Sequence, residues 1–285
     1  MCDTLVKEDL VFISEKPIEI PDDSYFTSIS ITCNGEAICA SCDQIQLENL
    51  YSLESPTGWV QLYKAPRNCS IQYATHEADN LYFIETVHEH GSKYTLVYCM
   101  QNFQNNVDNK TDLDKSEVFR FRNADYPQLK SEDISLSLSV LGNYCLVTYG
   151  RYALLYNKST KKLETSKLEK HGRCDNRVLV SNKCFWLTGG NNAMYRIQLE
   201  PLRRKCKLQE GGFYPGRNCC RLPDDKFMVM SQRPPYILKI LDTAGLHLNC
   251  PFLLYIIHAL TPVCYSENEK KSNNLTLIYV CFDIA

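Results

Sequence analysis

Two cysteines, Cys39 and Cys42, have the C-x-x-C spacing that is found in zinc sites and in redox-active dithiols. A zinc site needs a second pair of ligands, and a redox site needs a helix N-terminus that lowers the thiol pKa. The sequence shows neither context. In an extended strand, side chains three positions apart point to opposite faces. We therefore expect Cys39 and Cys42 to be inert.

The histidines also give no recognisable metal site. His88 and His90 form an H-x-H pair, which places both imidazoles on one face of a strand. Because no third ligand accompanies them, exposed residues at a hairpin tip are the simpler interpretation. The chain also has no G-x-S-x-G elbow, no P-loop and no G-x-G-x-x-G motif. We therefore predict no catalytic residue, no metal ligand and no cofactor.

The elements that must position any site are short strands. Apolar, β-rich runs recur along the chain, each bounded by Gly, Asn, Asp or Pro, and helical periodicity is almost absent. Six copies of a turn–strand–turn–strand unit can be aligned, at a period of about 40–45 residues. Their apolar centres fall near Ile38, Phe83, Leu146, Trp186, Met228 and Ile278.

This repeat predicts an all-β fold, a six-bladed β-propeller closed by an N-terminal strand. One four-stranded blade cannot bury both faces, so blades must pack on their neighbours, and ring closure removes exposed sheet edges. The alternative is a β-sandwich or two smaller β domains. We expect residues 1–285 to form a single domain, with blades at about 24–65, 66–103, 131–165, 171–205, 216–250, and 257–285 together with 5–20.

The longest step between repeat centres indicates an insertion after the second blade. We predict a polar loop over residues 104–130, which are rich in Asn, Asp and Lys. Within it, the run KSEVFRFRN alternates between polar and apolar residues. This run could form an extra hairpin or a strand that binds a partner, although a disordered loop tip is the simpler interpretation.

The first copy, GEAICASCDQIQLENL, resembles the NHL-repeat pattern, with Gly35, Ile38, Ala40, Asp43 and Ile45 at the matching positions. The other copies match in outline only, and WD-repeat and Kelch propellers stay open as alternatives. The resemblance implies binding of protein or RNA through one face, as in the C-terminal propellers of tripartite-motif proteins. The chain shows no RING or B-box zinc pattern.

Composition limits the function classes further. The net charge is -2 and the pI is about 6.3, which excludes binding of nucleic acid by bulk positive charge. No apolar window reaches the roughly 18 residues of a membrane span. The 15 cysteines are odd in number and spread through apolar runs, and the N-terminus is too charged for a signal peptide. We expect a monomeric intracellular protein, cytoplasmic or nuclear, that does not bind membranes.

The turns between the second and third strands of each repeat should emerge on one face of a propeller. Arg and Tyr in these turns are the residue types most enriched at binding hot spots. A basic run after the fourth copy, Arg203, Arg204 and Lys205, would contact phosphate if RNA were the ligand. The predicted partner-binding residues are Arg151, Tyr152, Asn191, Asn192, Arg233, Pro234, Pro235 and Tyr236.

The sequence therefore predicts a non-enzymatic scaffold or adaptor that binds a protein partner. Acidic residues in the first two turns, Asp43 and Glu89, would repel phosphate, which favours protein over RNA. Two alternatives remain open. One is an RNA-binding propeller of NHL type. The other is a metal-dependent hydrolase with ligands scattered over the inner strands of the central channel.

Overall fold

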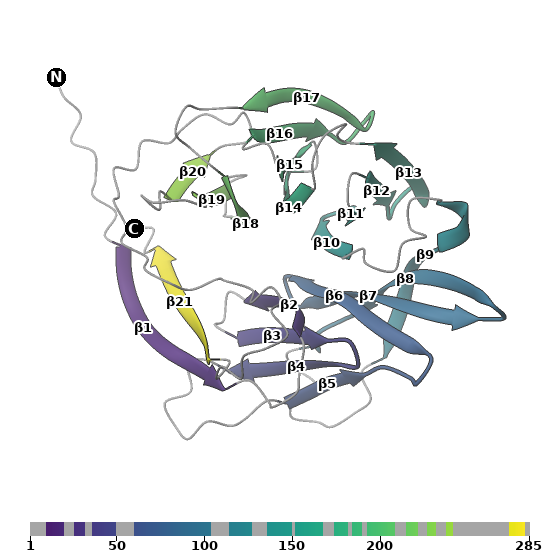
Figure 1. Ribbon diagram of the computed structural model, residues 1–285, viewed down its shortest axis with the longest axis horizontal. Coiled ribbons are helices and arrows are strands. Elements are labelled where there is room, and N and C mark those ends of the chain that lie inside the picture. Colours follow the sequence, from purple (N-terminus) through teal and green to yellow (C-terminus); the bar gives the residue numbers. More distant parts are fainter. Residues whose placement is uncertain are drawn as a thin grey trace, which may run out of the picture. The chain divides into compact units, whose positions relative to one another are not determined.

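The computed structural model of the chain is built almost entirely of antiparallel strands (Figure 1). It forms two compact units, one of residues Tyr25–Leu254 and one of Met1–Ser24 with Tyr255–Ala285. The prediction of an all-β fold is confirmed. The described residues are 10–19, 26–31, 36–49, 60–103, 114–126, 136–149, 152–167, 174–181, 184–189, 193–208, 215–221, 227–231, 238–241 and 274–282.

Five consecutive sheets make up the larger unit, and each is a meander in which every strand pairs antiparallel with the next. Sheet I contains β2 (Phe26–Ile31), β3 (Glu36–Ser41), β4 (Gln44–Asn49) and β5 (Val60–Lys64). Sheet II contains β6 (Cys69–Glu77), β7 (Asn80–Glu89), β8 (Ser92–Met100) and β9 (Lys115–Arg122), followed by the 3-10 turn η2 (Asn123–Asp125).

The remaining sheets of this unit repeat the same order. Sheet III contains β10 (Leu136–Leu141), β11 (Tyr144–Tyr149), β12 (Tyr152–Asn157) and β13 (Lys162–Lys167). Sheet IV contains β14 (Cys174–Ser181), β15 (Cys184–Gly189), β16 (Ala193–Gln198) and β17 (Arg203–Leu208). Sheet V contains β18 (Pro215–Arg221), β19 (Phe227–Ser231) and β20 (Leu238–Leu241).

Consecutive sheets contact one another through their first strands. β2 contacts β6, β6 contacts β10, β10 contacts β14, and β14 contacts β18. Four-stranded meanders that meet in this way are arranged as the blades of a propeller. The structure therefore supports a propeller-like fold, whereas the number of blades, the ring closure and the domain boundaries stay predictions.

The burial pattern explains why the strands have these sequences. The second strands of sheets II and III are buried over most of their length, as in β11, where all six residues are buried. Neighbouring sheets cover both faces of these strands, so their sequences are continuously apolar rather than alternating. The fourth strands β9 and β13 are largely polar and carry exposed charged residues. Charged residues on an edge strand discourage pairing with other chains.

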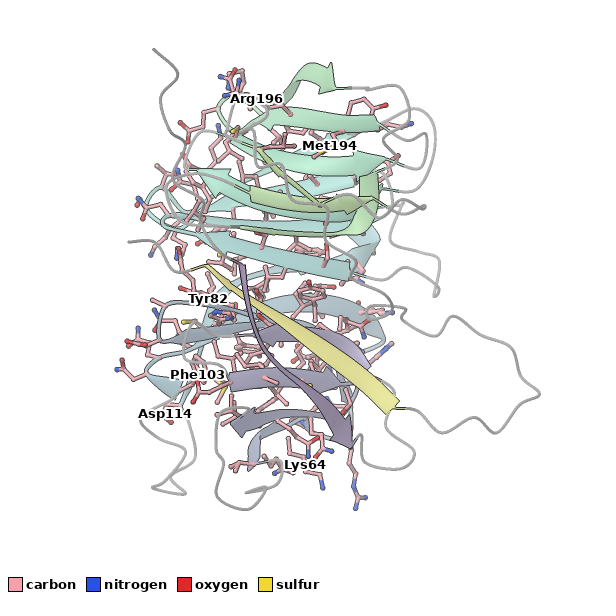
Figure 2. All side chains as sticks on the ribbon, turned by 90° about the vertical axis from the view of Figure 1, so that its left-hand side faces the viewer. Lys64, Tyr82, Phe103, Asp114, Met194 and Arg196 are labelled. Atoms are coloured by element: carbon pink, nitrogen blue, oxygen red, sulfur yellow. The ribbon has the colours of Figure 1, made fainter. Side chains whose placement is uncertain are left out.

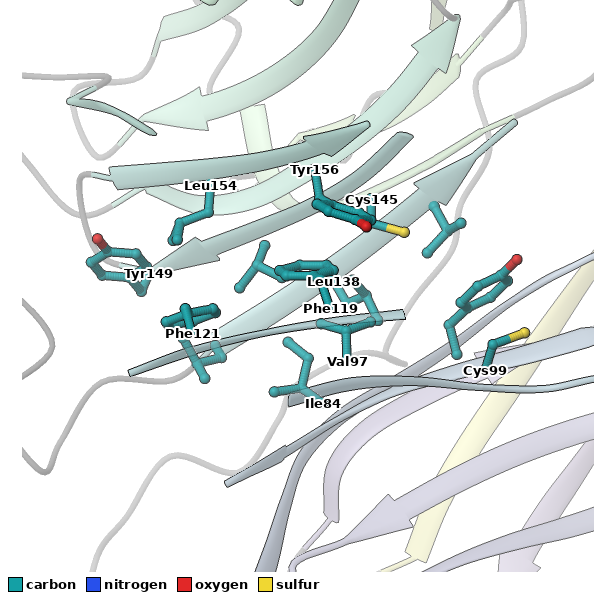
Figure 3. Packing of buried hydrophobic residues seen from close by; sticks show 14 residues of the cluster. Ile84, Val97, Cys99, Phe119, Phe121, Leu138, Cys145, Tyr149, Leu154 and Tyr156 are labelled. Atoms are coloured by element: carbon teal, nitrogen blue, oxygen red, sulfur yellow. The ribbon is translucent and has the colours of Figure 1, made fainter. Parts of the chain in front are cut away.

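Side chains from facing sheets form the core. Between sheets II and III, the rings of Phe119 and Tyr156 stack with centroids 4.5 Å apart (Figure 3). Between sheets I and II, the cluster includes Phe83 and Phe103, and both are fully buried. Phe103 is labelled in Figure 2. A third cluster joins sheets III and IV through residues such as Tyr195.

Residues 115–122, which the sequence placed inside a polar loop over 104–130, form β9 instead. This strand pairs with β8 and completes sheet II. Phe119 and Phe121 bury their rings in the core, while Arg120 and Arg122 are exposed. The alternation of the run KSEVFRFRN is therefore that of a half-buried edge strand.

The smaller unit contains one described sheet of two strands. β1 (Leu10–Glu19) pairs antiparallel with β21 (Asn274–Phe282). The register runs from Leu10 opposite Phe282 to Glu19 opposite Asn274, with one irregularity between Phe12 and Glu15.

Within the described part of the chain, no helix is long and apolar enough to cross a membrane.

Candidate partner-binding site

In sheets I and II, the turn between the second and third strands lies at the same edge as the connection between the two sheets. Hydrogen bonds in sheet I show this directly. The Ala65 N–H donates to the Asp43 carbonyl at 2.7 Å, and the Ile71 N–H donates to the Cys42 carbonyl at 2.8 Å. In sheet II, the His88 N–H donates to the Asn68 carbonyl at 3.3 Å. We call this edge of sheets I–III the turn face.

A tyrosine cluster lies on the turn face of sheet III. Tyr149 ends β11 and Tyr152 begins β12, and the two residues are directly paired across the turn. Their rings stack with centroids 5.4 Å apart and an interplanar angle of 19°. Tyr126, which follows η2, packs edge-on against Phe121 at 5.3 Å. We define Tyr126, Tyr149 and Tyr152 as the tyrosine cluster.

The three phenols differ in how far they are buried. Tyr149 is 1% exposed, whereas Tyr126 and Tyr152 are half-buried and pack on the same core cluster. Burial raises the pKa of Tyr149, and the nearby hydroxyls of Tyr126 and Tyr152 raise it further. Burial and the Asp125 carboxylate raise the pKa of Tyr126. Tyr126 and Tyr149 therefore stay neutral at physiological pH and keep their phenolic hydrogen-bond donors.

One lysine gives the cluster a positive charge. Lys167, the last residue of β13, pairs with Tyr152 in the strand register. Its Nζ lies 5.9 Å from the centroid of the Tyr152 ring, within the range of a cation–π contact. The Lys167 side chain is exposed, so its charge remains accessible. The site thus combines two partly exposed tyrosine rings with an exposed cation.

Tyr152 is the predicted partner-binding residue that the structure places in this site. The basic residues Arg203, Arg204 and Lys205 lie on β17, the fourth strand of sheet IV, and their contact with phosphate stays a prediction. The other predicted residues lie outside the described part of the chain. They are Arg151, Asn191, Asn192, Arg233, Pro234, Pro235 and Tyr236.

Sequence reasoning missed Tyr126, Tyr149 and Lys167. The hairpin register could have revealed Tyr149 and Lys167, because both pair with Tyr152 across strands of known length. Tyr126 carried no such signal, since it follows a strand that was interpreted as a loop.

The structure also shows the residues considered for metal or redox chemistry. Cys39 is buried and Cys42 is exposed. His88 and His90 are exposed beside the turn that His90 forms with Gly91, where both residues have positive φ. Among the residues that the structure describes, no three His, Cys, Asp or Glu side chains come together as a metal site.

The sequence also did not predict a serine–histidine pair on β2 and β6, the first strands of sheets I and II. Ser30 Oγ and His76 Nδ1 are 2.9 Å apart, joining β2 to β6. Burial lowers the pKa of His76, which keeps its imidazole neutral. Such a pair can be a nucleophile and base. Beside it, however, Ser28 Oγ accepts from the Ala74 N–H at 2.7 Å and donates to the Ala74 carbonyl at 3.1 Å. The hydrogen bonds of Ser28 and Ser30 therefore connect β2 of sheet I to β6 of sheet II.

Comparison with solved structures finds distant similarities. No family model and no curated protein matches the chain. A protein of unknown function from Bacteroides caccae is 12% identical, with a TM-score of 0.49 over 79% of this chain and 81% of that one. U3-55K is 12% identical, with a TM-score of 0.48 over 75% of this chain and 61% of that one. Hsv2 from Kluyvelomyces marxianus is 12% identical, with a TM-score of 0.46 over 79% and 64%.

Proposed function

We propose that this protein is a non-enzymatic interaction module that binds a protein partner through the turn face. The observation that supports this most is the tyrosine cluster beside Lys167. Tyr126 and Tyr152 present large rings whose inner faces are already fixed by packing. Tyrosine offers much contact area for little loss of side-chain entropy, and this makes it common at binding hot spots.

The scaffold in this proposal is a six-bladed propeller. In this proposal, the five described sheets of the larger unit are five blades, and a sixth blade would complete the ring. Pairing of an N-terminal strand with a C-terminal strand would fasten the ring and hold the turn face rigid. The finer resemblance to NHL propellers, drawn from Gly35 to Ile45, stays a prediction.

The experiment is affinity capture with matched variants, read out by quantitative mass spectrometry. Tyr152→Ala and Tyr126→Ala each truncate a ring that is partly exposed, so both should fold. We expect each to weaken capture of the same partner at least tenfold, which corresponds to the loss of about 1.4 kcal/mol at a hot spot. Capture that is unchanged in both variants would contradict the proposal.

RNA is the second candidate ligand, because stacked tyrosines beside a lysine also suit an unpaired base. Acidic side chains on the turn face favour protein. Asp43 and Asp125 are exposed, and Glu89 is half-buried. These carboxylates would repel a phosphate backbone, whereas a protein partner tolerates a mixed surface. Salt-sensitive crosslinking of single-stranded RNA to the tyrosine cluster would reverse this choice.

A metal-dependent hydrolase is the third candidate and the one with the least support. The proposal that the chain is not an enzyme can be tested by metal analysis of the purified protein. Stoichiometric Ca²⁺ or Zn²⁺ that survives dialysis would favour the hydrolase.

A further inference from the structure

Lys115, the first residue of β9, places its ammonium group among three aromatic rings. Its Nζ lies 4.0 Å from the centroid of the Tyr98 ring, 4.6 Å from that of Tyr63 and 6.0 Å from that of Phe83. Cations within about 6 Å of a ring centroid are attracted by the quadrupole of the ring. Tyr63 comes from sheet I, and the other two rings come from sheet II.

A buried carboxylate completes the surroundings of the ammonium group. Glu85 is 1% exposed, and its Oε2 lies 2.9 Å from Lys115 Nζ. The Tyr63 hydroxyl donates to Glu85 Oε1 at 2.8 Å and accepts a hydrogen bond from Lys115. Burial and the hydrogen bond to Glu85 raise the pKa of Tyr63, so its hydroxyl remains a donor. We call Tyr63, Phe83, Tyr98 and Glu85 the ammonium cage.

The walls of the cage are fixed independently of Lys115. The Phe83 ring packs against Tyr63 with centroids 4.9 Å apart and against Tyr98 at 5.4 Å. Phe83 itself is fully buried in the cluster between sheets I and II. A rigid site of this kind loses little conformational entropy when it takes up a ligand.

Lys115 is held less firmly than the walls. It lies at the start of the fourth strand, opposite Met100 in the register, and its side chain is 26% exposed. Asp114, which precedes it, is exposed (Figure 2). Strand ends open at a lower free-energy cost than strand centres. The ammonium can therefore leave the cage by rotation of its side chain, without loss of the sheet.

We propose that the ammonium cage is a binding site for a primary alkylammonium group, that of a lysine side chain on a partner protein, and that Lys115 is its internal occupant in the free protein. The cage shares no residue with the tyrosine cluster. The proposal therefore holds or fails independently of the proposed function of the turn face.

The two oxygen atoms in the cage set its specificity. Lys115 donates one hydrogen bond to Glu85 and one to Tyr63. A quaternary ammonium has no N–H group and would leave the buried Glu85 carboxylate with one hydrogen-bond donor fewer. An unpaired buried charge is strongly unfavourable. The cage should therefore select a primary ammonium over a fully methylated one.

Exchange of one ammonium for another changes little in the cage itself. The incoming group makes the same contacts that Lys115 gives up, so Glu85 is paired with a cation both before and after the exchange. The ligand competes with Lys115 for the cage. Because Lys115 is tethered, its effective concentration at the cage is in the millimolar range, as for other short tethers. A partner would therefore need further contacts beside the cage, and a free alkylammonium should compete only weakly.

The first test empties the cage with Lys115→Ala and uses n-butylammonium chloride as the probe. Removing one partner of a buried ion pair should lower Tm on the order of 10 °C. We expect n-butylammonium to recover most of this loss, and tetramethylammonium and sodium chloride at equal ionic strength to recover little. Equal recovery by all three salts, or none by n-butylammonium, would overturn the proposal. If the alanine variant does not fold, Lys115→Met keeps the aliphatic stem, and ammonium chloride then replaces n-butylammonium as the probe.

A matched control separates the cage from general salt effects. In the double variant Lys115→Ala with Glu85→Gln, the negative charge that holds the ammonium is absent. We expect n-butylammonium to raise Tm no more than sodium chloride does in this double variant. Recovery that persists without Glu85 would place the binding elsewhere and overturn the assignment.

The second test asks whether the internal lysine can be displaced when the amino-acid sequence of the protein is unchanged. Reductive methylation with ¹³C-formaldehyde labels lysines as dimethylammonium groups, which keep one N–H. Ring currents of Tyr63 and Tyr98 should shift the Lys115 methyl signal upfield, and Lys115→Arg assigns it. We expect n-butylammonium, added above the millimolar range, to move this signal toward that of an exposed lysine. A Lys115 signal that stays fixed throughout the titration would contradict displacement.

Discussion

At the scale of single residues, tyrosine hydroxyls paired with charged groups recur where sheets meet. Tyr63 donates to Glu85 between sheets I and II, and Tyr144 donates to Glu200 Oε1 at 2.6 Å between sheets III and IV. Burial and Glu200 raise the pKa of Tyr144 to about 12. Between sheets II and III, Lys158 donates to the Tyr82 hydroxyl at 3.2 Å. The sequence offered no signal for these pairs, because their members are far apart along the chain.

The buried His76 should make the stability of the protein depend on pH. Because burial lowers its folded-state pKa below 6.5, the unfolded chain binds the proton more tightly. Stability should therefore be unaffected by this group above about pH 6.5 and should fall as the pH drops below that value. Urea unfolding between about pH 7.5 and about pH 5.5 measures the effect. We expect a flatter profile for His76→Gln, whereas the exposed-site control His88→Gln should keep the wild-type slope.

At the scale of elements, the sequence predicted strands better where both faces are buried. The continuous apolar runs of β7 and β11 fall inside predicted repeats. β9 was assigned to a loop, because its charged residues outnumber its apolar ones. The alternation of polar and apolar residues in β9 was visible in the sequence. Whether this segment forms a strand, however, depends on the burial of Phe119 and Phe121 in the core between sheets II and III. Local sequence does not contain that tertiary information.

Phe119 should therefore be essential to the stability of sheets II and III. Its ring is 7% exposed and stacks on Tyr156, so Phe119→Ala leaves a cavity in the shared core. We expect a loss of about 3–5 kcal/mol in the free energy of unfolding. On the same strand, Glu117→Ala removes only a surface ion pair with Arg120 and should cost less than about 1 kcal/mol. Similar losses in both variants, measured by urea unfolding, would show that β9 does not pack as described.

At the scale of the whole molecule, the repeat period predicted the sheets, and the incomplete last copy predicted that residues 5–20 and 257–285 share one blade. Residues 10–19 and 274–282 form one antiparallel ladder. Nothing local to either segment specifies the register of this ladder, because the register follows from the path of the chain between them. Most site residues were predicted in turns, for which side-chain types suggest binding but the sequence contains no geometry.

The β1–β21 ladder can be tested by a designed crosslink. Val11 lies directly opposite Cys281, so Val11→Cys should form a disulfide with Cys281 on mild oxidation. Non-reducing mass spectrometry should detect one peptide that joins the two ends of the chain. Phe12→Cys is the matched control, because Phe12 lies opposite Val280 rather than Cys281 in the register. Equal crosslinking of both variants to Cys281 would contradict the register.

The most direct test of the turn face as the binding surface is hydrogen exchange measured with and without the captured partner. We predict that the partner slows exchange in peptides covering residues 121–126 and 147–154, which carry the tyrosine cluster. Peptides covering residues 158–161, the turn at the opposite end of sheet III, should exchange unchanged. Lys167→Glu should abolish the protection, and Lys161→Glu, an exposed lysine at that opposite end, should not. Protection confined to residues 158–161, or lost only in Lys161→Glu, would contradict the account.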